Sequence, residues 1–221
     1  MASRRYDIVC FDLDGTLLPS TTTVLHLSRW NGTEAAFAEL ERRYAAGEIS
    51  NTEVARADAA NWAGVAVADV HRALEDAVLI EGVQETVATL TEHGIDSYIT
   101  TLTWRFAAEY FAARYGFAGV TGCELTTDEH GVLGGVLRLF EAPDKVEFAR
   151  RICTERGIGP ERCVAVGDSQ SDLPLFGFAG LSIALNATPD ARAAADVVLD
   201  TDDLRDVLGY IVGPAAPPDH A

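Results

Sequence analysis

Two aspartates follow the first apolar run of the chain, in a pattern that suits metal and phosphate chemistry. Residues 6–11 read as a buried strand, and Asp12, Asp14, Gly15 and Thr16 come directly after it. Just past a strand end, the chain can curl so that one residue offers its carboxylate and the other its backbone carbonyl. Such an oxygen set suits Mg²⁺, and it places one aspartate to attack phosphorus while the second moves protons. The alternative is an acidic turn that only closes a strand.

Further polar residues follow two later apolar runs that also read as strands. Thr100 and Thr101 come at the end of one run, and Asp168 and Asp172 follow the run 162–166. Short strands that alternate with helices are typical of a parallel, doubly wound sheet, which binds its ligands at the carboxyl ends of the strands. We therefore expect these side chains to share one edge of the sheet with the first aspartates.

Lys145 stands out because it is the only lysine among 17 basic residues. An ammonium is a compact point charge with three rotatable donors, whereas a guanidinium is a wide planar fork. A chain that uses arginine nearly everywhere has kept the compact cation at this one place. Taken by itself, this residue could equally be a leftover surface lysine.

Composition and charge exclude several classes of function. The chain has 221 residues, 48% of them hydrophobic, and a net charge of −17. This charge argues against nucleic acids and anionic membrane surfaces as partners, because both require clustered Lys or Arg. The four cysteines form no C-x-x-C pair, which argues against zinc. No apolar run is long enough for a membrane helix, and no signal segment precedes the first strand, so we expect a cytoplasmic protein.

The order of the predicted elements indicates two parts. Residues 1–18 and 80–213 read as a Rossmann-like α/β core with a doubly wound parallel sheet. Between them, residues 19–79 read as an inserted, all-helical cap, with Thr33 as the N-cap of one of its helices. Residues 214–221 read as a disordered tail.

The spaced motifs resemble those of the haloacid dehalogenase superfamily. In order, they are Asp12-x-Asp14-x-Thr16, Thr100 after an apolar strand, Lys145, and Gly167-Asp168-x-x-x-Asp172. The helical insert and the sequence from residue 123 onward are similar to the phosphoserine phosphatase group of that superfamily. The resemblance covers roughly residues 6–211 and is thin across the insert.

This resemblance implies an enzyme that hydrolyses a small-molecule phosphomonoester with Mg²⁺. Asp12 would be the nucleophile that forms an aspartyl-phosphate, and Asp14 would protonate the leaving oxygen and later deprotonate water. The metal would be held by Asp12, the carbonyl of Asp14 and Asp168, with Asp172 ligating directly or orienting the site. The dehalogenases of the superfamily lack the second aspartate, so Asp14 indicates phosphate chemistry.

The resemblance also implies residues that bind the substrate. Thr100, the Thr101 amide and Lys145 would bind the phosphoryl oxygens. Candidate contacts by position alone are Thr21, Arg56 and Trp104. The phosphoserine phosphatases have a glutamate shortly after the first motif for the substrate's amino group, and this chain has no carboxylate there. The expected substrate is therefore a sugar, cyclitol or polyol phosphate rather than phosphoserine.

Three alternatives accompany this interpretation. The same aspartyl-phosphate could pass its phosphoryl group to a sugar hydroxyl, as in a phosphotransferase or phosphomutase. The chain could be a phosphoserine phosphatase after all. It could also be a non-catalytic binding protein on an enzyme scaffold. The intact set Asp12, Asp14, Lys145 and Asp168 argues against the last of these, and the protein is expected to be a monomer or homodimer.

Overall fold

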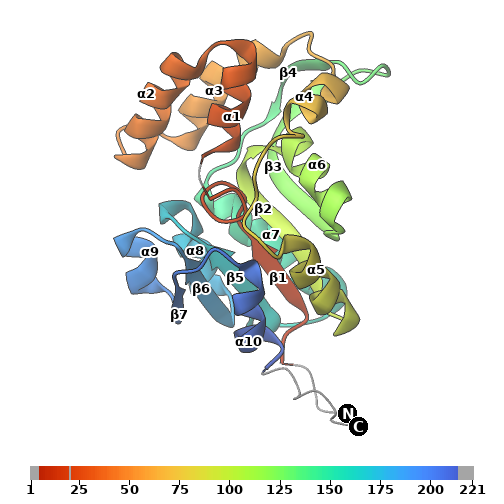
Figure 1. Cartoon of the computed structure of the whole chain (residues 1–221), viewed down its shortest axis with the longest axis vertical. Coiled ribbons are helices and arrows are strands. Elements are labelled where there is room, and N and C mark those ends of the chain that lie inside the picture. The colour runs from red at the N-terminus through yellow and green to blue at the C-terminus, as the bar shows by residue number, and fades with distance from the viewer. Residues whose placement is uncertain (1–4, 20, 214–221) are drawn as a thin grey trace.

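A computed structural model describes residues 5–19 and 21–213, and a seven-stranded sheet forms its centre (Figure 1). The strand order is β4-β3-β2-β1-β5-β6-β7, with β4 antiparallel to β3 and the other pairs parallel. The strands are β1 (Ile8–Phe11), β2 (Asp96–Trp104), β3 (Gly119–Thr127), β4 (Leu133–Arg138), β5 (Cys163–Gly167), β6 (Leu181–Leu185) and β7 (Val197–Leu199). This is the mostly parallel, doubly wound α/β fold that the sequence predicts.

Strand β1 lies at the point where the strand order reverses. It pairs with β2 on one side and with β5 on the other, and all four of its residues are buried. Chain segments that leave β1 and β5 therefore emerge side by side at the carboxyl edge of the sheet. In open α/β sheets this crevice is the usual place for a ligand.

Alternate residues of β1 pack into separate cores on the two faces of the sheet. Val9 and Phe11 belong to one core cluster, and Ile8 and Cys10 belong to the other. This division follows from the two-residue period of a strand, and it explains why β1 reads as a continuous apolar run.

Helices cover both faces of the sheet. α5 and α6 contribute to the first core, and α7, α8 and α9 contribute to the second. The helices are α1 (Thr23–Asn31), α2 (Glu34–Ala45), α3 (Asn51–Trp62), α4 (Val67–Ala73), α5 (Val83–Glu92), α6 (Arg105–Tyr115), α7 (Ala142–Arg156), α8 (Leu173–Phe178), α9 (Pro189–Ala194) and α10 (Leu208–Ile211). Among the helices of the described residues, none is long and apolar enough to cross a bilayer.

Helices α1 to α4 form a separate layer above the carboxyl edge of the sheet (Figure 1). The hairpin of β3 and β4 reaches up to this layer, where the Gly64 amide donates to the Leu133 carbonyl and the Val67 amide donates to the Gly131 carbonyl. Trp62 of α3 packs edge-on against Phe106 of the core. These contacts join the helical cap to the sheet. The exact division at residues 19–79 stays a prediction, and the proposed tail at 214–221 lies outside the described residues.

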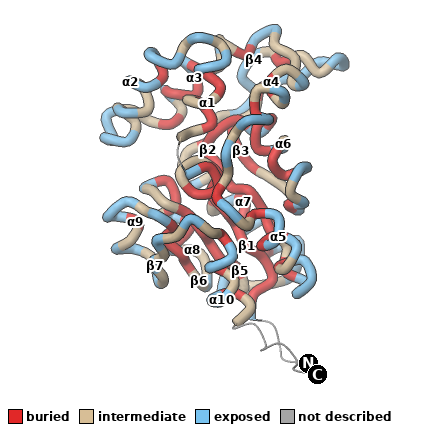
Figure 2. The backbone as a smooth tube through the Cα atoms, viewed as in Figure 1, coloured by how far each residue is buried: buried red, intermediate tan, exposed pale blue. Residues whose placement is uncertain are grey.

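Burial follows this architecture, with the sheet enclosed and the outer faces of the helices open to solvent (Figure 2). Two local expectations differ from the structure. Thr33 precedes α2 but its side chain makes no capping hydrogen bond, because its hydroxyl donates to Asn31 instead. β2 continues to Trp104, past the predicted end at residue 100. The longer strand carries its last residues to the site at the carboxyl edge.

Candidate active site

The carboxyl edge of the sheet brings together residues from three distant segments. Asp12 follows β1, Asp172 follows β5, and Lys145 projects from the first turns of α7. The Lys145 Nζ donates to the Asp12 Oδ1 at 2.7 Å, to the Asp172 Oδ1 at 2.7 Å and to the Ser171 Oγ at 3.1 Å. The ammonium thus has three acceptors for its three donors, so its hydrogen bonds are complete. The sequence motifs predicted that Lys145 lies beside Asp12 at this edge, and its role as a ligand of the phosphoryl group stays a prediction.

Lys145 remains charged although its side chain is fully buried. Burial alone lowers the pKa of this ammonium, but the adjacent Asp12 and Asp172 carboxylates outweigh burial and hold the pKa above its usual range. A buried cation paired with two carboxylates is stable only as a set, because removal of one member leaves the others uncompensated. The ammonium therefore fixes the position of Asp12.

Asp172 is held from both sides. Its Oδ1 binds Lys145, and its Oδ2 accepts from the backbone amides of Asp168 and Ser169 at 3.1 and 3.2 Å. It occupies the residue before α8 but makes no side-chain cap there. Gly167 makes this packing possible, since a Cβ atom at that position would lie 2.2 Å from the Asp172 Cγ.

Asp168 approaches the first motif closely. Its Oδ1 accepts from the Thr16 hydroxyl at 3.2 Å. A Cβ atom on Gly15 would lie 2.4 Å from the Asp168 Oδ2, and Gly15 has a φ of +89°. Both facts require glycine at position 15, because a larger residue would clash and would also strain the backbone. The loop after β1 is thereby packed against the loop after β5.

Three carboxylates form a cluster that suits a hard cation. Asp12, Asp168 and Asp172 each offer an oxygen, and these oxygens lie within 4.8 Å of one another. Burial raises the pKa of Asp168 to about 7, and Asp172 adds to this shift. Burial likewise raises the pKa of Asp12 well above its ordinary value, against the opposing effect of Lys145. One ammonium does not neutralise three carboxylates, so the donor set fits a bound divalent cation such as Mg²⁺.

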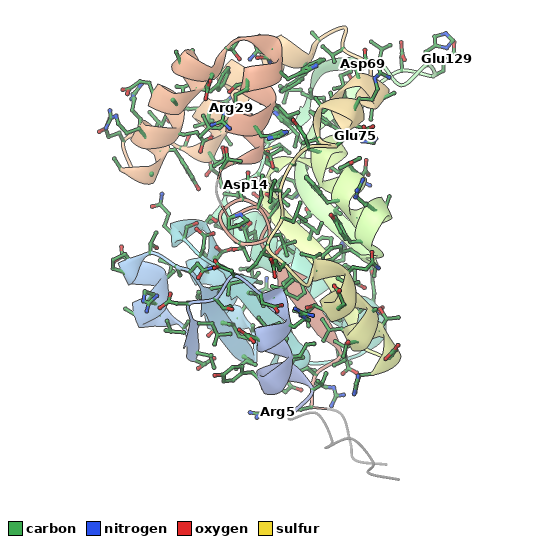
Figure 3. All side chains as sticks on the ribbon, viewed as in Figure 1. Arg5, Asp14, Arg29, Asp69, Glu75 and Glu129 are labelled. Carbon is green, nitrogen blue, oxygen red and sulfur yellow. The ribbon has the colours of Figure 1, made fainter. Side chains whose placement is uncertain are left out.

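Asp14 faces the helical cap. Its Oδ1 accepts from the Thr23 amide at 2.7 Å and from the Thr23 hydroxyl at 2.5 Å, at the start of α1. Figure 3 shows Asp14 between the cap helices and the sheet. Burial raises the pKa of Asp14 to about 6, although the two bonds from Thr23 act against this shift. A carboxyl with this pKa can exchange a proton near neutral pH.

A cavity of about 460 Å³ lies between the cap and the sheet edge. Its floor contains Asp12, Asp14 and Asp168, and its walls come from cap and core alike. Other residues that line the cavity include Thr21, Leu25, Glu41, Tyr44, Asn51, Val54, Ala55, Thr101, Leu102, Thr103, Trp104 and Asp190. The volume is that of a pocket for a small ligand.

The two adjacent threonines of β2 have different surroundings. Thr100 pairs with Thr121 in β3, and its hydroxyl donates to the Phe11 carbonyl at 3.4 Å, inside the sheet. Thr101 lines the cavity, and its hydroxyl accepts from the Thr103 amide at 3.1 Å. The assignment of Thr100 as a phosphate ligand therefore does not match its position. Side chains alternate along a strand, so a shift of one residue moves the hydroxyl to the other face.

Replacing each threonine by valine separates the two positions. Thr101→Val should lower kcat/KM about tenfold or more, because a hydroxyl of a cavity-lining residue is lost. Thr100→Val should leave kcat/KM within about twofold and change the unfolding free energy by only about 1 kcal/mol. Steady-state kinetics and urea denaturation of both variants measure these effects. A larger kinetic loss in Thr100→Val would restore the original assignment.

The remaining predicted contacts fall into two groups. Thr21 and Trp104 line the cavity. Arg56 is exposed on α3 and does not line it, so its proposed contact with substrate is not supported. Trp104 is fixed by its indole N–H, which donates to the buried Asp58 carboxylate, and the Trp62 indole donates to the same carboxylate at 2.7 Å. Asp58 thus anchors a cavity wall.

The cap residues that line the cavity but were not predicted from the sequence include Glu41 and Tyr44. Both lie on α2, four and seven residues after the buried Phe37, and so on the same helical face. That spacing was visible in the sequence and could have identified them. The Gln170 side chain donates to the Tyr44 carbonyl at 3.0 Å, which ties this part of the cap to the loop after β5.

Comparison with known proteins agrees with this arrangement. A model of the haloacid dehalogenase-like hydrolase family matches residues 9–177. The match extends over more than half of the chain and includes all three segments that build the site. The chain belongs to this family, and it is a phosphoric monoester hydrolase of the phosphoserine-phosphatase-like kind.

Individual relatives match nearly the whole chain. A phosphoserine phosphatase of Methanocaldococcus jannaschii is 26% identical over 94% of this chain and 99% of its own length. Phosphoserine phosphatase SerB2 of Mycobacterium tuberculosis is 29% identical over 96% of this chain, which spans 52% of that protein. A solved structure described as a phospho-aspartyl intermediate analogue of phosphoserine phosphatase has a TM-score of 0.80 at 25% identity, covering 94% of this chain and 100% of that one.

Proposed function

We propose that this protein hydrolyses a small phosphomonoester through an aspartyl-phosphate on Asp12, with Mg²⁺ as its cofactor. The observation that carries the proposal is the position of Asp12. Its carboxylate is buried and accepts a hydrogen bond from Lys145 on one oxygen. It also forms part of the cavity floor, beside Asp168. A nucleophile fixed by one oxygen keeps the other oxygen oriented for attack.

The chemistry divides into two displacements at phosphorus. First, an Asp12 oxygen forms a bond to phosphorus, the ester P–O bond breaks, and the leaving oxygen takes a proton from Asp14. Second, water gives a proton to Asp14 and attacks the phosphorus, which releases inorganic phosphate and restores the Asp12 carboxylate. We assign to the Thr101 hydroxyl and to the positive charge of Lys145, which acts from behind Asp12, the stabilisation of charge on the phosphoryl oxygens.

Asp12, Asp168 and the carbonyl of Asp14 are the residues that would hold the metal ion. When bound, Mg²⁺ supplies positive charge that lets a carboxylate approach a phosphate dianion. Both oxygens of Asp172 already have partners in Lys145 and the amides of Asp168 and Ser169. Of the two roles considered for Asp172, direct metal ligand and orienting residue, we therefore propose the orienting role.

Asp14→Asn should separate esters by their leaving groups. For an alkyl phosphate, kcat should fall about 10²- to 10⁴-fold, because a poor leaving oxygen needs the proton that Asp14 donates. For p-nitrophenyl phosphate, whose leaving group is stable as an anion, the rate constant for formation of the aspartyl-phosphate should fall much less. Burst kinetics with the two esters measure that first step. Equal losses for both esters would contradict the acid role of Asp14.

The cavity argues for a leaving group without a carboxylate. The relatives carry the name phosphoserine phosphatase, so phosphoserine is the natural comparison. No Arg, Lys or His lines the cavity among the described residues, and a carboxylate would meet Glu41 and Asp190 instead. The hydroxyl groups of Thr21 and Thr103 suit an alcohol-bearing substrate such as a sugar, cyclitol or polyol phosphate.

Release of phosphate from a panel of phosphomonoesters tests the proposed function. We expect turnover with Mg²⁺ that stops on chelation with EDTA and returns when Mg²⁺ is added in excess. Phosphate should appear in plain buffer, without an added acceptor alcohol, which separates a hydrolase from a phosphotransferase. A folded, Mg²⁺-loaded protein that releases no phosphate from any ester would contradict the proposal and favour a binding role.

A further inference from the structure

Glu41 is a carboxylate on the cavity wall without a partner. It lies on the inner face of α2, is half-buried, and forms no hydrogen bond or ion pair with any described residue. The two arginines that follow it are engaged elsewhere. Arg42 pairs with Glu39 and Glu48, and Arg43 reaches Glu48. Glu41 therefore lines the cavity with no partner among the described residues.

The whole cavity shares this excess of negative charge. Five carboxylates line it: Asp12, Asp14, Glu41, Asp168 and Asp190. Lys145 contacts the floor residue Asp12, but it does not line the cavity and is shared by Asp12 and Asp172. A divalent cation would compensate the floor, but the part of the cavity beside Glu41 would stay anionic. Beside Glu41, a leaving group that carries a positive charge therefore binds more favourably than one that carries a negative charge.

The surroundings of Glu41 suit a small organic cation. Tyr44 follows it by three residues on the same helical face, and Trp104 lines the same cavity from the core. Aromatic faces attract ammonium groups, and quaternary ammonium groups in particular. The same cavity has an apolar part, to which Leu25, Val54, Ala55 and Leu102 contribute. An alkyl chain that carries an amine matches this combination of surfaces.

We propose that the cavity selects phosphate esters of small amino alcohols, with the ammonium beside Glu41 and no carboxylate on the leaving group. This inference rests on the phosphatase function proposed above and specifies its substrate class. It narrows the alcohol esters considered above to those with a positive charge, in place of a neutral sugar, cyclitol or polyol phosphate, and it differs from phosphoserine by the missing carboxylate. Burial and the nearby Asp14 and Asp58 raise the pKa of Glu41 to about 7, and a bound ammonium would favour its ionised form.

The test compares kcat/KM for four esters with the full chain and Mg²⁺. The probes are phosphoethanolamine, phosphocholine, glycerol 3-phosphate and phosphoserine. Wild type should prefer at least one of the two amino alcohol esters over both other esters. Glu41→Gln should reduce the ratio of kcat/KM for that ester over glycerol phosphate by about 10- to 100-fold, the effect of losing one charge-assisted contact in a buried site.

A matched control lies on the same helix. Glu39 is exposed and paired with Arg42, so Glu39→Gln removes the same charge without changing the cavity. Its substrate ratios should equal those of wild type. Glu41→Gln should fold normally, because the replaced carboxylate has no partner to lose, and circular dichroism checks this. Free ethanolamine or choline should inhibit wild type competitively, and Glu41→Gln more weakly.

The outcomes separate this inference from the proposed function. Wild type that prefers glycerol phosphate or phosphoserine would overturn the amino alcohol assignment while leaving the phosphatase intact. The same holds if the substrate ratio is unchanged in Glu41→Gln. Absence of turnover with every ester, including p-nitrophenyl phosphate, would overturn both.

Discussion

Asp12→Asn should abolish turnover, with kcat reduced by at least about 10³-fold for every phosphomonoester. An amide has no anionic oxygen to attack phosphorus, and the replacement is otherwise nearly isosteric. Lys145 can still donate hydrogen bonds to Asp172 and Ser171 in the variant, so we expect the local structure to be retained. Steady-state phosphate release and a thermal unfolding curve, both with Mg²⁺, measure activity and folding separately.

The conservative nature of this change makes its outcome informative. A well-folded Asp12→Asn protein with more than about a tenth of wild-type activity would contradict the nucleophile assignment. Asp190→Asn serves as a control, since Asp190 also lines the cavity but does not belong to the cluster of three carboxylates. Its kcat for a neutral ester should fall far less than that of Asp12→Asn.

Lys145→Met should be the most destabilising single change at the site. It leaves Asp12 and Asp172 buried without their cation, and breaking such a buried ion pair costs about 3–5 kcal/mol of unfolding free energy. The methionine side chain fills a similar volume, so packing changes little. Urea denaturation of the metal-free protein measures the loss, and activity should fall strongly as well.

Magnesium should compensate part of this loss. A divalent cation that binds Asp12 and Asp168 relieves the repulsion that Lys145 normally relieves. The rise in unfolding midpoint on adding Mg²⁺ should therefore be larger for Lys145→Met than for wild type. If metal-free Lys145→Met had the same unfolding free energy as metal-free wild type, the ion pairs of Lys145 would contribute little to stability. That result would contradict the electrostatic account of the site.

The central part of the site was predictable because its residues sit at the ends of buried strands. Asp12 and Asp168 follow β1 and β5, which are adjacent, parallel and recognisable as apolar runs. Their position at the sheet edge follows from topology alone. Lys145 was identifiable by composition and motif spacing, and the structure brings it into contact with Asp12 and Asp172.

Both Thr100 and Thr101 were expected to bind phosphate, but only Thr101 lines the cavity, and the reason is geometric. β2 runs on to Trp104, so Thr100 remains paired within the sheet while Thr101 reaches the cavity. The apolar pattern of a strand indicates where the strand begins, but it does not indicate which of its last residues lines a cavity. An error of one residue is enough to exchange the two faces.

The cap was recognised as helical, but the faces of its helices were not assigned. Arg56 was proposed to contact substrate and is exposed. Glu41 was overlooked although it follows Phe37 by one helical turn. Tertiary packing decides which polar residue of an amphipathic helix faces a cavity, and the sequence period alone does not distinguish the core from an enclosed pocket.

The most direct test of the central claim is to trap the phosphoryl group on the protein. Wild type mixed with substrate and Mg²⁺, quenched in acid within the first turnovers and digested, should yield the peptide that contains Asp12 with one added phosphoryl group. Neutral hydroxylamine should remove that group, as it does from an acyl phosphate. Phosphate release with no modified Asp12 peptide, or with the phosphoryl group on another residue, would contradict the account.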